Sequence, residues 1–240
     1  MWLGARMPSL LAVLKPSHGI PVTWWRARTQ WRGRPLSVLL LMMGLWLFGT
    51  GEALLINAGI GVSPWTVFAQ GVSVRSGLAI GLATALTSTA VLALWIPLRQ
   101  KPGLGTVSNI VVVAAGLEVM MFVVPIPHAF ALQLLQCVIA VAVIGLGSGF
   151  YLTAGMGPGP RDGWMTGLHH RFGWPVWVIR FGIEITVLVI GWFLGGTVGL
   201  GTLIFALFVG PCVGYGLRFC GWIGGARVTI AEDEHPEFEA

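Results

Sequence analysis

The chain has 240 residues, of which 55% are hydrophobic and only 10% are charged, and its mean hydropathy is +0.83. These values lie far outside the range of water-soluble domains, so they exclude a soluble globular protein and predict an integral membrane protein. The net charge of +5 comes from 14 Lys and Arg against 9 Asp and Glu. We attribute this charge to membrane topology and expect no nucleic-acid partner.

The chain divides into a leader, a membrane domain and a tail. Residues 1–35 are basic and rich in Trp and lack the apolar core of a cleaved signal peptide, so we expect a cytoplasmic or interfacial leader. Residues 36–220 hold six apolar stretches that are each suited to cross a bilayer as a helix: 36–58, 77–98, 106–124, 129–152, 176–194 and 202–219. Residues 221–240 form an acidic cytoplasmic tail. Continuous apolar runs favour helices over barrel strands, so we predict an all-α polytopic membrane bundle.

The distribution of basic residues predicts how the bundle sits in the membrane. Cytoplasmic loops of membrane proteins carry an excess of Lys and Arg. With six spans and the N-terminus inside, 12 of the 14 basic residues fall on the cytoplasmic side: Arg6, Lys15, Arg26, Arg28, Arg32, Arg34, Arg99, Lys101, Arg161, Arg171, Arg218 and Arg227. The links at 125–128 and 195–201 contain no Lys or Arg. We therefore expect both termini to be cytoplasmic.

An internal repeat is the most informative feature of the sequence. A shift of 96 residues aligns 49–106 with 145–202 without a gap, and the match ends in the identity Gly-Leu-Gly-Thr. The two copies occupy about 36–124 and 129–219, with three predicted spans each. Because three is odd, the second copy must be inverted in the membrane relative to the first. Inverted repeats build many secondary transporters, whereas the alternative is a duplication that only made a larger scaffold.

Each repeat also contains a segment that is too short to cross the membrane. The two segments are 64–71 and 160–172. Gly61 and Pro64 mark the first as a glycine loop followed by a short helix, and Gly159 and Pro160 mark the second. Glycine permits close approach of the backbone, and the free N–H groups of a helix N-terminus attract anions. Each half-helix either dips into the bilayer towards a central site or lies along the interface.

Four ionisable residues lie inside predicted spans, where a charge is costly unless it faces protein or water. Arg180 and Glu184 are four residues apart on one helix face, so they can form an ion pair. Glu52 and Glu118 have no partner nearby in sequence, and either can pair with Arg180 across the bundle or carry a proton. Asn57, at the end of the first span, can form a hydrogen bond between helices.

The second glycine loop carries two charges that the first lacks. Arg161 and Asp162 occupy the positions of Trp65 and Thr66 in the first copy. An Arg beside a helix N-terminus suits a carboxylate or phosphate, whereas Asp162 in the first turn can simply complement the helix dipole. The candidate substrate-binding or pathway residues are these two charges and the following: Glu52, Asn57, Gly61, Pro64, Glu118, Gly159, Pro160, Arg180 and Glu184.

Motifs of enzymatic and metal chemistry are missing from the sequence. It contains no Ser-His-Asp arrangement, nucleotide-binding loop or zinc motif. Cys137, Cys212 and Cys220 have no metal-binding or redox spacing. We expect no catalytic residue, metal or cofactor, and therefore no enzyme.

Several motifs resemble a known group of proteins. They are Gly-Pro-Arg-Asp-Gly at 159–163, the downstream Arg180 and Glu184, and Gly-Gly-Thr-Val-Gly-Leu-Gly-Thr at 195–202. This pattern, together with the glycine loop at 59–65, is similar to the YczE/YyaS/YitT group of bacterial membrane proteins. The resemblance covers about 36–219 and implies a location in the bacterial inner membrane. It supplies no substrate and no catalytic residue.

Two functions remain open at this point. The first is a small transporter or channel, built from inverted repeats, for a small solute or ion. The second is a non-transporting scaffold or regulator that acts on a protein partner through the leader or the tail. The lipid bilayer is a partner in either case, and so small a bundle is also compatible with a homodimer.

Overall fold

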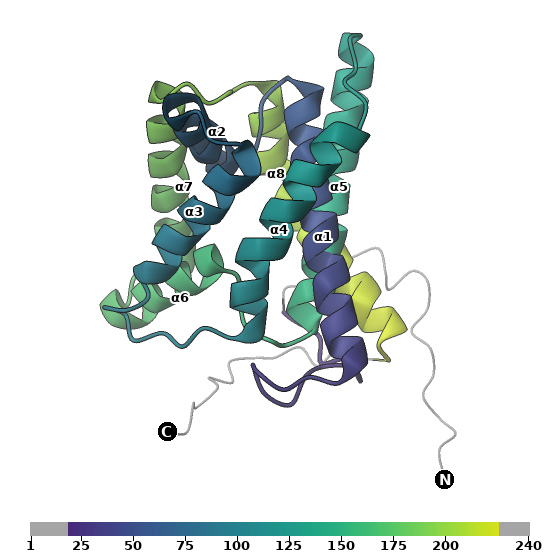
Figure 1. Ribbon diagram of the computed structural model, residues 1–240. Coiled ribbons are helices and arrows are strands. Elements are labelled where there is room, and N and C mark those ends of the chain that lie inside the picture. The colour runs from purple at the N-terminus through teal and green to yellow at the C-terminus, as the bar shows by residue number, and fades with distance from the viewer. Residues whose placement is uncertain (1–18, 226–240) are drawn as a thin grey trace.

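The computed structural model describes residues 19–225, and within this range the chain forms eight helices and no strand (Figure 1). The helices are α1 (Pro35–Ala58), α2 (Pro64–Ser76), α3 (Ile80–Ala93), α4 (Leu104–Val123), α5 (Phe130–Thr153), α6 (Pro160–Phe172), α7 (Val176–Phe193) and α8 (Leu200–Ile223). A helix satisfies its own backbone hydrogen bonds, as the interior of a bilayer requires. Much of the predicted leader and tail, at 1–18 and 226–240, lies outside the described residues.

Five helices are long and apolar enough to cross a membrane. They are α1, α4, α5, α7 and α8, with 18–24 residues and mean hydropathies of 1.8–2.2. α2 and α3 are joined by a bend of 115° and together can supply a sixth crossing. Phe122, Trp177 and Phe193 are 85%, 73% and 73% exposed, as expected for outer faces that contact lipid. The prediction of a polytopic all-α bundle is confirmed.

The second predicted span, 77–98, is shorter in the structure. α3 has 14 residues, which extend about 21 Å. Pro97 has no backbone N–H, so a continued helix would lack the hydrogen bond from residue 97 to the carbonyl oxygen of Ala93. In addition, the indole of Trp95 donates a hydrogen bond of 2.8 Å to the carbonyl oxygen of Pro160. A contact with α6, distant in sequence, thus accompanies the early end of this span.

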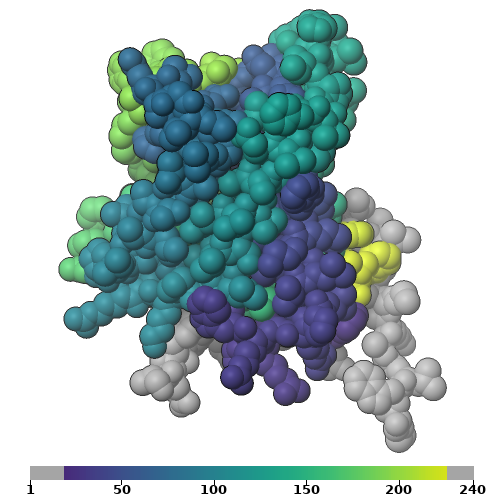
Figure 2. Space-filling view, in the orientation of Figure 1, coloured from purple at the N-terminus to yellow at the C-terminus, as the bar shows by residue number. Residues whose placement is uncertain are grey.

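The helices form two layers that lie side by side (Figure 1). In the first layer α1 packs against α4 and α5, and α5 packs against α8. In the second layer α2 packs on α7, and α3 packs on α2 and α6. α3 also contacts α4 and so joins the layers. Figure 2 shows two lobes separated by a notch at the end of the molecule where α2 lies.

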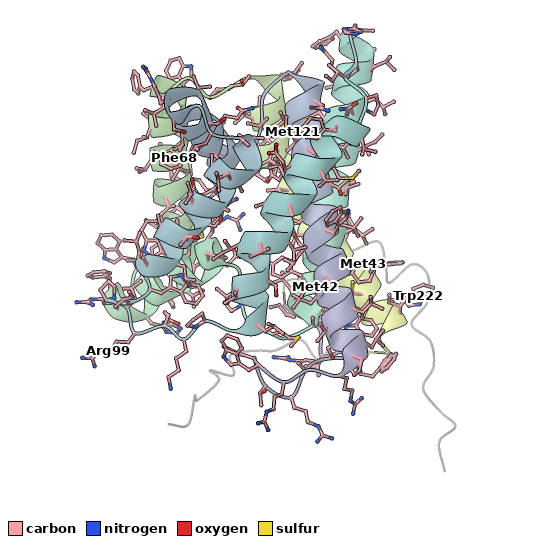
Figure 3. The ribbon with its side chains drawn as sticks, viewed as in Figure 1. Met42, Met43, Phe68, Arg99, Met121 and Trp222 are labelled. Carbon is pink, nitrogen blue, oxygen red and sulfur yellow. The ribbon has the colours of Figure 1, made fainter. Side chains whose placement is uncertain are left out.

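Glycine allows the helices to approach closely. A Cβ atom at Gly44 of α1 would lie 2.7 Å from the carbonyl oxygen of Gly147 in α5, and one at Gly147 would lie 2.6 Å from that of Gly44. α8 is equally close to α5, because a Cβ at Gly216 would collide with the α5 backbone. Gly191 of α7 likewise makes room for the backbone of Phe68 in α2 (Figure 3). Lipid removes the hydrophobic drive between helices, so this close packing supplies much of the association energy.

Three pairs of helices start at the same interval of 96 residues as the sequence repeat, whereas α1 and α5 start 95 residues apart. α2 begins at 64 and ends at 76, whereas α6 begins at 160 and ends at 172. The starts of α3 and α7, at 80 and 176, and of α4 and α8, at 104 and 200, differ by the same 96. In Figure 1, α1 and α4 begin at the end of the bundle where α5 and α8 finish, so the two pairs of helices run in opposite directions. α2 and α6 lie at opposite ends of the bundle.

Basic side chains gather at one end of the bundle. Among the described residues, the loops at the end where α1 begins contain Arg26, Arg28, Arg32, Arg34, Arg99 and Lys101. Figure 3 shows Arg99 projecting from this end. The described loops of the opposite end contain no Lys or Arg, and Arg75 lies nearby in the last turn of α2.

Candidate functional site

A cavity with a volume of about 200 Å³ lies between the two layers and is lined by residues from all eight helices. The first turns of α2 and α6 both contribute to its wall, although the two helices lie at opposite ends of the bundle. The structure brings eight of the eleven candidate residues to this wall: Glu52, Pro64, Gly159, Pro160, Arg161, Asp162, Arg180 and Glu184. Asn57, Gly61 and Glu118 are not among the residues that line the cavity.

The cavity lies between equivalent positions of the two repeats. Twenty of its 24 lining residues form ten pairs that are 96 residues apart. The pairs include Glu52 with Ser148 and Trp65 with Arg161. In several pairs one copy contributes a charge and the other a hydroxyl or aromatic group. The two repeats therefore contribute to the same wall with different chemistry.

At the start of α2, hydroxyl groups hold a buried carboxylate. Ser63 is the N-cap, and its Oγ accepts a hydrogen bond from the backbone N–H of Thr66 at 3.4 Å. The carboxylate of Glu52, which is only 2% exposed, accepts hydrogen bonds from Ser63 Oγ at 3.0 Å and from Thr66 Oγ1 at 2.7 Å. A helix N-terminus stabilises a negative charge. The predicted start of α2 is confirmed, but the helix continues to Ser76 instead of ending near residue 71.

At the start of α6, two charged side chains make different contacts. Asp162 lies in the first turn, and its Oδ2 accepts a hydrogen bond of 2.8 Å from the hydroxyl of Tyr151 in α5. The guanidinium of Arg161 stands over the ring of Trp65, 4.9 Å from the ring centroid. This cation–π contact joins two positions that are equivalent in the repeats. The predicted helix start, with Gly159 as N-cap and Pro160 in the first turn, is confirmed.

Arg180 and Glu184 form the ion pair that their spacing predicts. The distance from Arg180 Nε to Glu184 Oε1 is 2.9 Å. The two side chains remain 50% and 27% exposed, so they stand at the rim of the cavity. Neither Glu52 nor Glu118 pairs with Arg180.

The candidate residues outside the cavity stabilise helix ends and loops. Glu118 Oε2 accepts a hydrogen bond of 2.7 Å from the backbone N–H of Gly81, in the first turn of α3. The side-chain amide of Asn57 donates to the carbonyl oxygens of Met121 at 3.0 Å and Val124 at 2.9 Å, at the end of α4. These polar side chains therefore supply hydrogen-bond partners for backbone groups at helix ends.

Gly61 belongs to a contact between the two repeats. It has a φ of 115°, and a Cβ there would lie 2.7 Å from the backbone nitrogen of Gly199. The N–H of Gly201 donates a 2.7 Å hydrogen bond to the carbonyl oxygen of Ile60. The N–H of Gly105 donates a bond of the same length to Met156, so the equivalent donor and acceptor have exchanged repeats. Each glycine loop is therefore held by the Gly-Leu-Gly-Thr motif of the other repeat. This exchange accounts for the identity of the motif in both copies.

Sequence reasoning missed several polar residues of the wall. Tyr151, Thr84, Ser88 and Ser148 line the cavity, yet each is unremarkable within its apolar run. The repeat could have found three of them, because Thr84, Ser88 and Ser148 are 96 residues from Arg180, Glu184 and Glu52. The residue equivalent to Tyr151 is the apolar Leu55, so the repeat gave no indication that Tyr151 lines the cavity.

The fold and the site define a class of protein. It is a polytopic helical membrane protein with a cavity lined by both apolar and charged side chains, to which two short helices, α2 and α6, contribute their first turns. Among the described residues, no three His, Cys, Asp or Glu side chains are placed to hold a metal ion. The three cysteines are free, and Cys137 and Cys220 are buried.

The comparisons with known proteins identify the family. The sequence model of a family described as "Family of unknown function (DUF6198)" matches residues 35–218, and the chain belongs to this family. A protein of Haemophilus influenzae called an uncharacterized protein is 38% identical over 199 residues, which cover 83% of this chain and 91% of that protein. No solved structure matches the chain.

Two proteins of Bacillus subtilis are also similar to this chain. The uncharacterized membrane protein YczE is 29% identical over 176 residues, covering 72% of this chain and 82% of YczE. The uncharacterized protein YyaS is 26% identical over 166 residues, covering 68% and 83%. These relatives confirm the resemblance to the YczE and YyaS group, and none of their names states an enzymatic activity.

Proposed function

We propose that this protein is a small membrane transporter or channel and that the central cavity is the binding site on its pathway. The observation that carries the proposal is the meeting of two half-helix N-termini and five charged side chains in one cavity. An ionisable group inside a membrane protein is costly unless it faces protein or water, so a fold that keeps charged groups around an internal space points to a polar ligand.

We infer further that the chain consists of two inverted repeats. The common interval of 96 residues in helix starts and lining residues supports this inference, as do the opposite directions of related helices. In transporters of this architecture the substrate binds at the repeat interface, near the half-helix N-termini. The pairing of lining residues at an interval of 96 residues supports this part of the proposal.

A location in the bacterial inner membrane with the basic end inside belongs to the same proposal. It rests on the basic loops at the end where α1 begins and on the bacterial relatives. The scaffold alternative depends on the leader and tail, which lie mostly outside the described residues.

A ligand screen on the purified protein tests the proposal. Amino acids, carboxylates, amines, sugars and inorganic ions are added in turn while thermal unfolding is followed in detergent. A ligand at 100 times its dissociation constant stabilises the folded protein by roughly 2.7 kcal/mol. We expect Arg161→Gln and Glu184→Gln to lose this shift and Arg75→Gln, outside the cavity, to keep it. If no class of solute stabilises the protein against thermal unfolding, the result would contradict a binding cavity.

A further inference from the structure

The cavity holds two opposite charges that are not in direct contact with each other. Glu52 and Arg161 both line it, but they form no ion pair. The guanidinium of Arg161 donates no hydrogen bond to a described residue and instead contacts the face of Trp65. The other acidic groups of the wall are engaged, since Asp162 accepts from Tyr151 and Glu184 pairs with Arg180. A cation and a separate anion thus face the same space.

The first turn of α2 contacts both charges. Ser63 and Thr66 donate their hydroxyl hydrogens towards the Glu52 carboxylate, whereas the neighbouring Trp65 contacts Arg161. One turn of helix therefore positions the two groups at the same time. The carboxylate also keeps room for another donor, because Oε1 has only the hydrogen bond that it shares with Oε2 from Ser63 Oγ.

The volume of the cavity and the charges on its wall limit which ligands it can bind. About 200 Å³ is below the roughly 300–1,000 Å³ of pockets for drug-sized ligands, so the occupant is small. A simple anion would pair with Arg161 but would be repelled by Glu52. A simple cation would pair with Glu52 but would be repelled by Arg161. Such like-charge contacts reject a ligand strongly where water is scarce.

From this geometry we infer that the cavity binds a small zwitterion, whose carboxylate pairs with Arg161 and whose ammonium group pairs with Glu52. The inference rests on the proposed function and specifies its substrate class. A guanidinium presents several N–H donors in a planar fork that matches a carboxylate. The Glu52 carboxylate, held by two hydroxyls, accepts from an ammonium that has three donors.

Isothermal titration calorimetry with matched probes tests the inference. γ-Aminobutyrate carries both groups on a four-carbon chain, whereas butyrate carries only the carboxylate and n-butylammonium only the ammonium. Glycine and β-alanine bring the two charges closer together than γ-aminobutyrate does, and L-alanine adds a methyl group to glycine at the same charge separation. We expect at least one of these amino acids to bind the wild-type protein at least about tenfold more tightly than both single-charge probes.

Two variants assign the charges to their residues. Glu52→Gln should abolish the preference for the zwitterion over butyrate, and Arg161→Gln should abolish the preference over n-butylammonium. Butyrate or n-butylammonium binding as tightly as every amino acid would overturn the inference, and so would a failure of all four amino acids to bind. If another solute class still stabilises the protein, the proposed function survives that result. The wild-type comparison decides the class even if a variant does not fold.

Discussion

At the scale of single residues, the two unpaired glutamates of the sequence have separate roles. Glu52 faces the cavity and is held by the hydroxyls of Ser63 and Thr66. Glu118 does not line the cavity and accepts a hydrogen bond from the backbone of Gly81. Sequence alone could place both carboxyls in apolar helices, but it could not separate them, because each role depends on a helix that is distant in the chain.

We expect Glu118→Ala to lower the free energy of unfolding by about 1 kcal/mol, because the N–H of Gly81 loses its acceptor. Glu118→Gln keeps a carbonyl oxygen in this position and should cost less. Ligand binding should change in neither variant. Thermal unfolding in detergent and the ligand screen measure these effects. A loss of ligand binding with unchanged stability would show that Glu118 belongs to the pathway after all.

At the scale of helices, glycine determines which surfaces meet. A Cβ at Gly216 of α8 would collide with the backbone of α5, so Gly216→Ala should destabilise the bundle by about 1–3 kcal/mol. Gly210 lies on the same helix, and a Cβ there would have no atom within 4 Å, so Gly210→Ala should be neutral or slightly stabilising. Thermal unfolding of the matched pair measures the difference. Equal stability of the two variants would contradict the close packing of α5 on α8.

The helix starts were predictable where their signals are local. Ser63 with Pro64, and Gly159 with Pro160, mark the starts of α2 and α6 within two residues of sequence. The end of α2 was less predictable, because Gly71 resembles a stop signal but lies inside the helix. There it allows the backbone of α7 to approach, since a Cβ would lie 2.6 Å from the carbonyl oxygen of Gly191. A packing glycine and a capping glycine look the same in sequence.

At the scale of the whole molecule, the basic end predicts the orientation in the membrane. Lys101 lies in the α3–α4 loop at the basic end, and His128 lies in the α4–α5 link at the opposite end. In a variant without its natural cysteines, His128→Cys should react with a membrane-impermeant maleimide on intact cells. Lys101→Cys should react only after the membrane is permeabilised. The reverse pattern would contradict the orientation inferred from charge.

The apolar stretches of the sequence made a polytopic helical bundle predictable, but the cavity required the structure. The interval of 96 residues already related the two halves of the chain. It did not reveal that Trp65 and Arg161, equivalent in the repeats, contact each other across the cavity. That contact depends on how the two copies pack against each other, and no local sequence pattern predicts this packing.

The measurement that tests the account most directly is the accessibility of the cavity from the two sides of the membrane. Ser88 lines the cavity and is 4% exposed, whereas Ser37 is fully buried and does not line it. Each is replaced by Cys in a variant without Cys137, Cys212 and Cys220 and is exposed to an impermeant thiol reagent in right-side-out and inside-out vesicles. A pathway predicts that Ser88→Cys reacts from both sides and Ser37→Cys from neither. Reaction of Ser88→Cys from one side only, or from neither, would contradict transport through this cavity.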